Sequence, residues 1–411
     1  PLAASVPPCC SVSITLSARP DDSVAALNVG DVLKQAVSPF PDQLKITHVN
    51  AQSLLCHIDE FRCTFSDCVS DIILVSESWL KPAIPNRLVA LDDYMLIRND
   101  RLHKNGGGVA AYIKRALLPV HKLSSDNSRA SRPEYMFFEI KSNGVKMLIA
   151  VCYRPPHIGF MSEFEEALLE LLVPYEHVAI MGDFNTDLLG PDTYDKVQLT
   201  TMFFANGMTL LPLQATHHTS TSDTLLDLVA VADKKSAVSH GQIPFPGLSA
   251  HDLIYLVYNI KRPKPKPKMI TYRDYNNINL PNLFKNTFDL DWLSIFNTND
   301  VNQMSNIIND NILFLYEKHV PLKTRRVTRD PAPWLTEEIR HLMRDRDYWC
   351  KKARQSKIPD DFNRYKRLRN SCKQMIRNAK AGFYQNLVSS KRSSTSSLWR
   401  VLRGIGASKE R

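Results

Sequence analysis

The feature that most constrains the fold of this chain is a succession of short apolar runs between Leu44 and Ile260, each five to nine residues long. Runs of this length, bounded by polar and turn-forming residues, are typical of β-strands. Three amphipathic segments, residues 53–69, 162–173 and 194–207, interrupt the series and predict helices. Many strands with few helices favour packed sheets that carry their helices outside. The runs are LKITHV, DIILVS, YMLIR, GVAAYI, MFFEI, VKMLIAVCY, HVAIM, LLDLVAV and DLIYLVY.

A second feature, the segment KRPKPKPKM, divides the chain. Alternating prolines remove backbone donors and favour an extended polyproline form, so this segment cannot be a helix or a central strand. The leader before the first strand is rich in Ser, Pro and Ala and shows no sustained periodicity. We predict a poorly ordered leader at residues 1–43, a strand-rich domain at 44–260, a Pro/Lys linker at 261–270 and a helical basic tail at 271–411.

Charge is unevenly distributed along the chain. Residues 1–260 hold 20 Lys and Arg against 28 Asp and Glu, a net charge of −8, whereas residues 261–411 hold 32 against 14, a net charge of +18. A basic segment of this kind is expected where a protein meets phosphates. The tail is also rich in interleaved Trp and Tyr, which favours contact with nucleic acid, although a solvated charged face is the alternative interpretation.

Two helices are predicted within the tail. Glu337 and Glu338 lie where the first turn of a helix favours acidic side chains, and apolar residues follow on one face. After Pro359, apolar residues recur at three- and four-residue spacing, and Arg and Lys cover the other faces. The pattern predicts a basic antiparallel helical hairpin.

Other features narrow the class of protein. The chain has no run of eighteen apolar residues and no basic region at its amino terminus, so we expect neither a membrane span nor secretion. The eight cysteines form no CxxC pair, which favours a reducing, intracellular compartment. His217 and His218 lack the spacing of metal ligands and are interpreted as non-functional. The glycines at 106–108 predict a tight turn, and a phosphate cradle is the weaker alternative.

Polar side chains that can handle a phosphate follow several of the predicted strands. Loops at one edge of a rigid sheet are where sites are usually built. The set contains carboxylates, amides, one histidine and one tyrosine, with no thiolate cluster, and therefore favours an oxygen-ligated cation such as Mg²⁺ over zinc. Taken singly, each residue is more often a turn or core residue, so only the whole set argues for a site. The residues are Asn50, Glu77, Tyr153, Arg154, Asp183, Asn185, Asp227 and His251.

The ordered motifs HVNAQSL, LVSESWL, CYRPP, MGDFNTD, LLDLV and LSAHD resemble the endonuclease/exonuclease/phosphatase superfamily, which includes DNase I and apurinic endonucleases. More narrowly, NGGGVAAYIK and YRPP resemble the apurinic-like endonuclease domain of non-LTR (LINE-type) retrotransposons. PWLTEEIR, YKRLRN and SLWRVLRGIG resemble the connector towards their reverse transcriptase, which is itself absent here. The resemblance implies an α/β fold: a four-layer sandwich of two packed mixed β-sheets flanked by helices, as in DNase I, followed by an α-helical basic tail.

Carried over to this sequence, the resemblance implies that Glu77 binds the metal, Mg²⁺ or alternatively Mn²⁺, with Asn50 beside it at the phosphate. Asp183 would orient or deprotonate the attacking water, and Asn185 would hold that water. These implied roles would explain why the apolar strand HVAIM is followed so closely by a carboxylate and an amide.

The same resemblance implies that Tyr153 contacts the phosphate, next to Arg154 in the YRPP motif. His251, held in its tautomer by Asp227, would stabilise the pentacovalent state or pass a proton.

Two positions depart from the family pattern. Ala250 stands before His251 where the family often has Asp, so the usual SDH has become SAHD. On an extended strand Asp252 would lie across from His251, so we do not expect it to replace the missing carboxylate. Gln52 occupies a position that is acidic in some apurinic endonucleases. We therefore expect a single-metal site that depends mainly on Glu77, with weakened activity.

The resemblance implies a Mg²⁺-dependent phosphodiester hydrolase, a retrotransposon endonuclease that nicks target DNA and leaves a 3′-hydroxyl primer. Expected partners are DNA, the element's RNA through the basic segment 323–411, and a covalently linked reverse transcriptase; no membrane partner is expected, and nuclear action is implied. Two alternatives stay open. One is a catalytically decayed element copy that binds nucleic acid, and the other is a phosphatase or phospholipid phosphodiesterase of the same fold.

Overall fold

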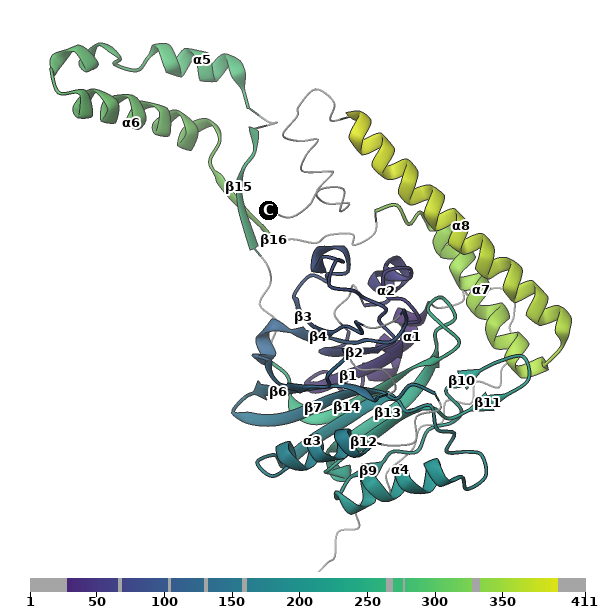
Figure 1. The fold of residues 1–411 in the computed structure, drawn as a ribbon. Coiled ribbons are helices and arrows are strands. Elements are labelled where there is room, and N and C mark those ends of the chain that lie inside the picture. The colour runs from purple at the N-terminus through teal and green to yellow at the C-terminus, as the bar shows by residue number, and fades with distance from the viewer. Residues whose placement is uncertain are drawn as a thin grey trace, which may run out of the picture. The chain divides into compact units, whose positions relative to one another are not determined.

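The computed structural model (Figure 1) describes the chain in eight stretches: residues 28–65, 69–102, 105–128, 132–156, 161–263, 269–275, 278–326 and 333–390. The predicted leader lies largely outside these residues, but its last part includes helix α1 (Val29–Val37). Most of the predicted Pro/Lys linker also lies outside them. The chain divides into two compact units, one formed by residues 1–263 together with 331–411 and the other by 264–330.

Two six-stranded mixed sheets form the centre of the first unit, as the sequence predicts. In both, one central pair of strands is parallel, β1 with β2 and β7 with β8, and the other pairs are antiparallel. The first sheet has the order β13 (Ala237–Pro244), β14 (Asp252–Lys261), β1 (Gln43–Asn50), β2 (Ile72–Ser76), β4 (Val109–Lys114), β3 (Tyr94–Asn99). The second has the order β5 (Val120–Ser124), β6 (Glu134–Ser142), β7 (Val145–Tyr153), β8 (His177–Asp183), β12 (Asp227–Val231), β9 (Thr209–Leu210).

The sheets bury both of their faces, which explains the nearly continuous apolar runs. In β2, Ile72 and Leu74 belong to the core between the sheets, whereas Ile73 and Val75 belong to a second core on the outer face. Successive side chains of a strand point to opposite faces, so a strand buried on both sides must be apolar at every position. Each such side chain contributes about 1.5–3 kcal/mol on burial.

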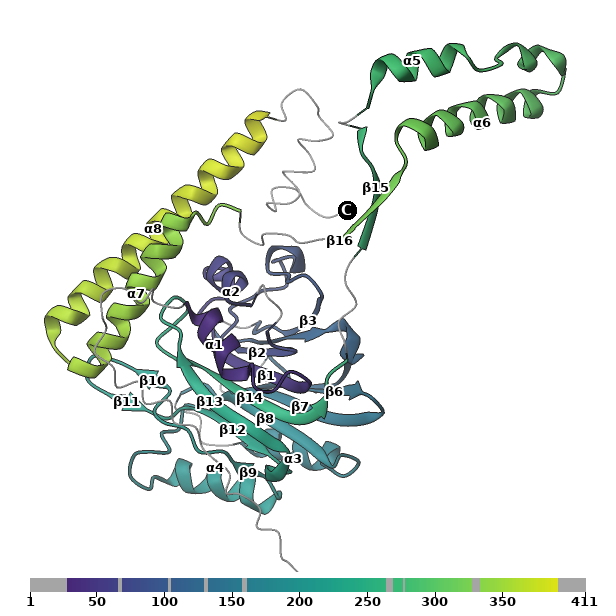
Figure 2. The same ribbon diagram turned by 180° about the vertical axis from the view of Figure 1, so that it is seen from behind.

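Helices cover the outer faces and complete four layers (Figures 1 and 2). Helices α1 and α2 (Ile58–Phe65) pack on the first sheet, and α3 (Ser162–Leu172) and α4 (Tyr194–Ala205) pack on the second. The fold is therefore the predicted DNase I-like α/β sandwich. The smaller elements are β10 (His217–His218), β11 (Asp223–Thr224) and the 3₁₀ turns Asn86–Leu88, Arg115–Leu117 and Lys234–Ser236.

The start of α3 and the end of α4 each carry a local sequence signal for a helix end. Ser162 and Glu165 have the spacing of a capping box, but Ser162 is already the first helical residue of α3, and Met161 at the cap position makes no side-chain hydrogen bond. Asn206 and Gly207 have the composition of a helix stop, and α4 ends there with Asn206 as its cap.

The predicted basic hairpin consists of α7 (Glu337–Ser356) and α8 (Pro359–Ser390), which lie antiparallel on the sandwich (Figures 1 and 2). Ion pairs join it to the strand-rich part: Arg346 to Glu60, Arg354 to Asp252, Lys357 to Asp223 and Lys380 to Asp59, at 2.6–3.0 Å. Its own small core contains Trp334, Leu335, Ile339, Met343, Cys372 and Ile376. The hairpin is thus a folded part of the first unit.

The second unit is small. It contains a two-stranded antiparallel sheet of β15 (Met269–Arg273) and β16 (Leu322–Arg326), helices α5 (Leu280–Phe288) and α6 (Val301–His319), and the 3₁₀ helix Leu293–Asn297. No described helix of the chain is long and apolar enough to cross a membrane.

We expect Gly182→Ala to lower the free energy of unfolding by about 2–3 kcal/mol, as overpacking does in a dense core. A Cβ at Gly182 would lie 1.9 Å from the backbone carbonyl oxygen of Cys152, which cannot move without disturbing β7. Gly382→Ala is the matched control: no atom lies within 4 Å of its Cβ position, and alanine should stabilise α8 by about 0.5–1 kcal/mol. Urea unfolding measures both, and equal effects would contradict the packing argument.

Candidate active site

The ends of strands from both sheets meet at one edge of the sandwich. Asn50 ends β1 and is paired in register with Ser76, so Glu77 follows directly beside it. In the second sheet, Asp183 ends β8 and is paired with Tyr153 on one side and Asp227 on the other. The carboxyl ends of parallel strands thus deliver residues far apart in sequence to one place.

The side chain of Asn50 is the meeting point. Its Nδ2 donates to Glu77 Oε1 at 2.9 Å and to Asp183 Oδ2 at 2.8 Å, and it lies 3.5 Å from His251 Nε2. Asn50 and Asp183 are buried. One amide therefore joins residues of the first sheet to a carboxylate of the second.

Asp183 and Asn185 form a tight corner after β8. The backbone N–H of Asn185 donates to Asp183 Oδ1 at 3.0 Å, and Asn185 has φ of 45°, a left-handed conformation that asparagine tolerates better than most residues. Its side-chain amide donates to the carbonyl of Arg154 at 2.7 Å. These contacts fix the direction of the Asp183 carboxylate and explain the spacing of the GDFN motif.

His251 is held by Asp227. Its Nδ1 donates to Asp227 Oδ2 at 2.8 Å, and the same oxygen accepts from Thr216 Oγ1 at 2.7 Å. This arrangement turns Nε2 towards the site, 4.0 Å from Asp183 Oδ2. Although burial disfavours the charged imidazole, the carboxylates of Asp227 and Asp183 raise the pKa of His251 to about 9.

The buried carboxylates create an unbalanced negative charge. Burial, together with the charges of Asp227 and Glu77, raises the pKa of Asp183, and His251 only partly offsets this. Asp227 Oδ1 is buried with no hydrogen-bond partner among the described residues. His48 lies 3.7 Å from that oxygen, but burial lowers its pKa to about 4, so it is neutral and adds no positive charge.

A hard divalent cation fits this donor set. Asp183 and Asp227 bring carboxylate oxygens within 4.8 Å of each other beside His251, and the Glu77 carboxylate shares the Asn50 amide with Asp183. Carboxylate oxygens are the ligands that Mg²⁺ and Mn²⁺ prefer. The Oδ1 of Asn50 accepts from the backbone N–H of Gln52 at 3.2 Å, so this oxygen points away from the carboxylates. The Nδ2 group faces Glu77 and Asp183 and orients their carboxylates.

The side chains of Tyr153 and Arg154 point in different directions. Tyr153 is nearly buried below the site, with Arg101 5.7 Å from its ring centre, and burial and the charges of Glu77 and Asp183 raise the pKa of its hydroxyl. Arg154 turns away: its guanidinium is buried, donates to Thr186 and pairs with Asp195 at 2.7 Å. The structure therefore does not bring the Arg154 side chain to the other seven residues.

Sequence reasoning missed His217. Its backbone pairs with His251, and the two rings have centroids 4.6 Å apart. Burial and the neighbouring charge of His251 lower the pKa of His217 to about 4. The His217 ring is therefore neutral and packs against the imidazole of His251. Nothing in the local sequence signals this contact, because it depends on pairing between segments 34 positions apart.

Asp252 does not replace the aspartate that the family often has at the position of Ala250. Its side chain lies on the opposite face of β14 from His251, as predicted, and accepts from Arg354 at 2.7 Å and Gln242 at 3.2 Å. His251 keeps its partnership with Asp227 regardless of this departure. The glycines at 106–108 all have positive φ, and the chain bends at 105–106; the N–H of Gly108 donates to the carboxylate of Glu134, so that donor is already used.

The sandwich and its buried edge of carboxylate, amide and imidazole groups define a DNase I-like protein with a hydrolytic type of site. A family model described as the endonuclease/exonuclease/phosphatase family matches residues 21–256, more than half of the chain. The chain therefore belongs to the endonuclease/exonuclease/phosphatase family. The members of this family are nucleases or phosphatases that typically depend on a divalent metal.

Other comparisons are more distant. A model described as the female sterile protein K10 C-terminal domain matches residues 335–394, and no curated protein matches the chain. Similar solved structures include the AP endonuclease LMAP from Leishmania major, with 14% identity and a TM-score of 0.46, covering 58% of this chain and 97% of that one. An endonuclease/exonuclease/phosphatase family protein from Leptotrichia buccalis has 15% identity and a TM-score of 0.42, covering 53% of this chain and 100% of that one. The endonuclease domain of TRAS1, a telomere-specific non-LTR retrotransposon, has 13% identity and a TM-score of 0.42, covering 53% of this chain and 100% of that one.

Proposed function

We propose that this chain is a Mg²⁺-dependent DNA endonuclease of the non-LTR retrotransposon type, which nicks target DNA and leaves a 3′-hydroxyl primer. The observation that carries the proposal is the convergence of Glu77, Asp183 and His251 around the amide of Asn50. A carboxylate base, an oxygen-rich cation site and a charged imidazole are the parts that phosphodiester hydrolysis needs.

In the proposed reaction, Asp183 takes a proton from water as the water oxygen attacks phosphorus, and Asn185 helps to position that water. A carboxylate with a raised pKa is suited to act as a base near neutral pH. The P–O3′ bond breaks, and the 3′ oxygen leaves and takes up a proton from solvent. The imidazolium of His251 stabilises the negative charge of the pentacovalent state, and Tyr153 contacts the phosphate. Mg²⁺ or Mn²⁺ held by Glu77 would supply positive charge to the phosphodiester.

The narrower assignment to a retrotransposon depends on the ordered motifs and on the basic tail. The net charge of +18 over residues 261–411 supports a nucleic-acid partner over a soluble phosphomonoester or a phospholipid. Binding of the element's RNA by residues 323–411, a covalently linked reverse transcriptase and nuclear action belong to the same proposal.

Supercoiled-plasmid nicking by the full chain of 411 residues tests the proposal. We expect nicked plasmid with Mg²⁺ or Mn²⁺, none with EDTA, and none with His251→Ala. If the protein hydrolyses a soluble phosphomonoester or a phospholipid but does not nick plasmid, that compound would replace DNA as the proposed substrate. DNA binding without any turnover would support a decayed copy, and Ala250→Asp would then be the variant to test for rescue.

Asp227→Asn is expected to slow nicking roughly 10²-fold, a typical value for proton-transfer and charge-stabilising partners. Asparagine cannot stabilise the imidazolium, so the pKa of His251 in the metal-free protein should fall from about 9. An NMR titration of the His251 ring measures this shift alongside the rate. Asp92→Asn, at an exposed carboxylate, is the control and should leave both values unchanged. An unaltered His251 pKa in Asp227→Asn would contradict the proposed role.

A further inference from the structure

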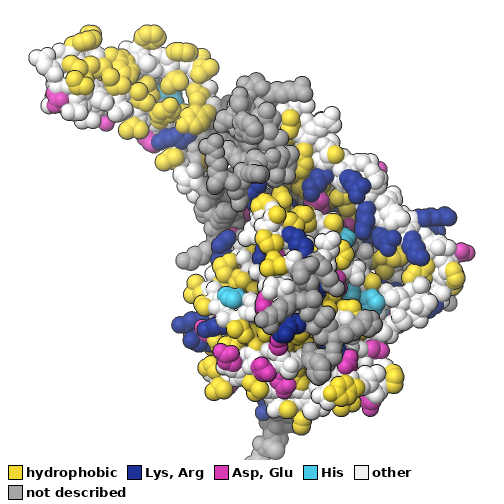
Figure 3. All heavy atoms as spheres, viewed as in Figure 1, with side chains coloured by type: hydrophobic (Ala, Val, Ile, Leu, Met, Phe, Trp, Pro, Cys, Tyr) yellow, Lys and Arg dark blue, Asp and Glu magenta, His cyan; other side chains and the backbone are white. Residues whose placement is uncertain are grey.

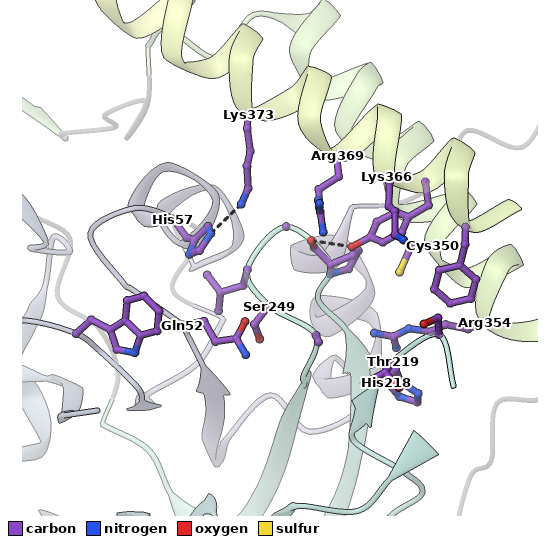
Figure 4. Close-up of a pocket in the computed structure, with 18 residues that line it drawn as sticks. Gln52, His57, His218, Thr219, Ser249, Cys350, Arg354, Lys366, Arg369 and Lys373 are labelled. Carbon is purple, nitrogen blue, oxygen red and sulfur yellow. Dashed lines mark hydrogen bonds between the residues drawn. The ribbon is translucent and has the colours of Figure 1, made fainter. Parts of the chain in front are cut away.

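A pocket of about 400 Å³ lies between the α7–α8 hairpin and the loops that carry the active site (Figure 4). On one side it is lined by Gln52 and Ser249, close in sequence to Asn50 and His251. Ser249 also donates to the backbone carbonyl of Asn50 at 2.7 Å. Ser249 in the pocket wall is therefore bonded to the end of β1 that carries Asn50, so the pocket lies next to the proposed active site.

The opposite wall is a row of three cations on α8. Lys366, Arg369 and Lys373 are spaced three and four residues apart, so they share one face of the helix, and all three line the pocket. Lys and Arg side chains also gather over this hairpin on the molecular surface (Figure 3). We name these three residues the α8 basic row.

Among the described residues, the α8 basic row has no ion-pair partner. None of the described residues that line the pocket is acidic, and none of the three side chains forms an ion pair with a described residue. Arg354, also in the lining, is by contrast neutralised by Asp252. Lys373 Nζ has His57 Nε2 3.4 Å away, and burial and the charge of Arg369 lower the pKa of this lysine. Uncompensated cations in a half-enclosed pocket favour an anionic ligand.

We propose that the α8 basic row binds backbone phosphates of the substrate DNA beside the phosphate that is cut. The inference depends on the proposed endonuclease function and adds a substrate-binding surface to it, supplied by the tail. The row spans about 10.5 Å along α8, and duplex DNA carries one negative charge per about 1.7 Å of its axis, so more than one phosphate can lie within reach of the row. Duplex DNA is favoured over RNA because the row adjoins the site where the target strand must lie.

The test compares two full-length triple variants. Lys366→Ala/Arg369→Ala/Lys373→Ala removes the row. Lys141→Ala/Lys234→Ala/Lys235→Ala removes the same charge from exposed lysines at the far ends of the strands, one near the end of β6 and two just after the end of β12. Affinity for a labelled 20-bp duplex is measured by fluorescence anisotropy in EDTA over a salt series, and nicking is measured with Mg²⁺.

We expect the row variant to bind DNA roughly 10- to 100-fold more weakly, with a salt dependence shallower by about 2–3 in log–log slope, and to raise KM for nicking more than it lowers kcat. The control should match wild type. Equal affinity and slope in the two variants would overturn the inference, and so would a larger loss of affinity for a single-stranded RNA than for the duplex. If the wild type fails to nick while only the row variant loses DNA affinity, the endonuclease proposal fails and the DNA-binding row stands.

Thermal unfolding of both variants excludes a folding defect. Should the row variant unfold early, the double variant Lys366→Gln/Lys373→Gln, at two exposed positions, provides the same comparison with an expected slope change of about 2. No slope change in a folded double variant overturns the inference as well.

Discussion

Asp183→Asn is expected to lower the rate of plasmid nicking by about 10³- to 10⁴-fold without destabilising the protein. The amide keeps the size of the carboxylate but cannot accept a proton from water, which removes the proposed base. It also removes a buried charge that lies near Asp227 and Glu77 and whose pKa is raised by burial. We therefore expect the melting temperature at pH 8 to be at least that of the wild type.

The control for Asp183→Asn is Asp192→Asn, which alters a carboxylate whose side chain is 80% exposed and should leave rate and melting temperature unchanged. Nicking assays and thermal unfolding on the same preparations separate loss of chemistry from loss of fold. A variant that keeps more than a tenth of the wild-type rate would exclude Asp183 as the base.

Arg346→Ala is expected to lower the free energy of unfolding by about 3–5 kcal/mol, since it leaves buried acids without their counterion. Only 2% of the Arg346 side chain is exposed, and its Nη1 lies 2.6 Å from Glu60 Oε1. Asp347 lies on its other side, and burial raises the pKa of that carboxyl to about 6 despite the arginine. Urea unfolding and proteolysis of the hairpin measure the loss of docking.

Two comparisons make the Arg346 prediction specific. Glu60→Met/Arg346→Met replaces that pair with apolar side chains and should recover part of the lost stability, because Asp347 still lacks the arginine. Arg344→Ala removes a partner of Glu337, whose side chain is 77% exposed, and should change stability by less than about 1 kcal/mol. If the double replacement is no more stable than Arg346→Ala, the unpaired charge is not the cause.

The sequence is most informative where burial is complete. All nine apolar runs form strands, and most of these strands are buried on both faces, which favours apolar side chains at most positions. The edge strands β5 and β13 were not predicted: β5 has exposed residues such as Val120 and His121, and β13 is only partly buried, so neither has a continuous apolar run. Strand pairing, and with it the position of each element in its sheet, depends on contacts between distant segments that periodicity does not record.

In the active site, too, the sequence predicted some features and not others. Motifs at strand ends predicted the residues that meet at Asn50, but residue type alone could not say which way a side chain turns after its strand. Arg154 follows Tyr153 directly, yet its buried side chain turns away and pairs with Asp195. His217, interpreted as non-functional, lies against His251. Likewise, the charge of the hairpin was predicted, but its attachment to Asp252 and Glu60 was not.

The first unit is discontinuous in the chain, and this has a consequence for synthesis on the ribosome. Residues 264–330 must be translated between the strand-rich part and the hairpin that completes it. At 5–20 residues per second, those roughly 70 residues take about 3 to 14 s. During that interval Asp59, Glu60 and Asp252 have no cationic partner from α7 or α8. Until α7 and α8 emerge, these three carboxylates lack the cations that neutralise them in the folded protein.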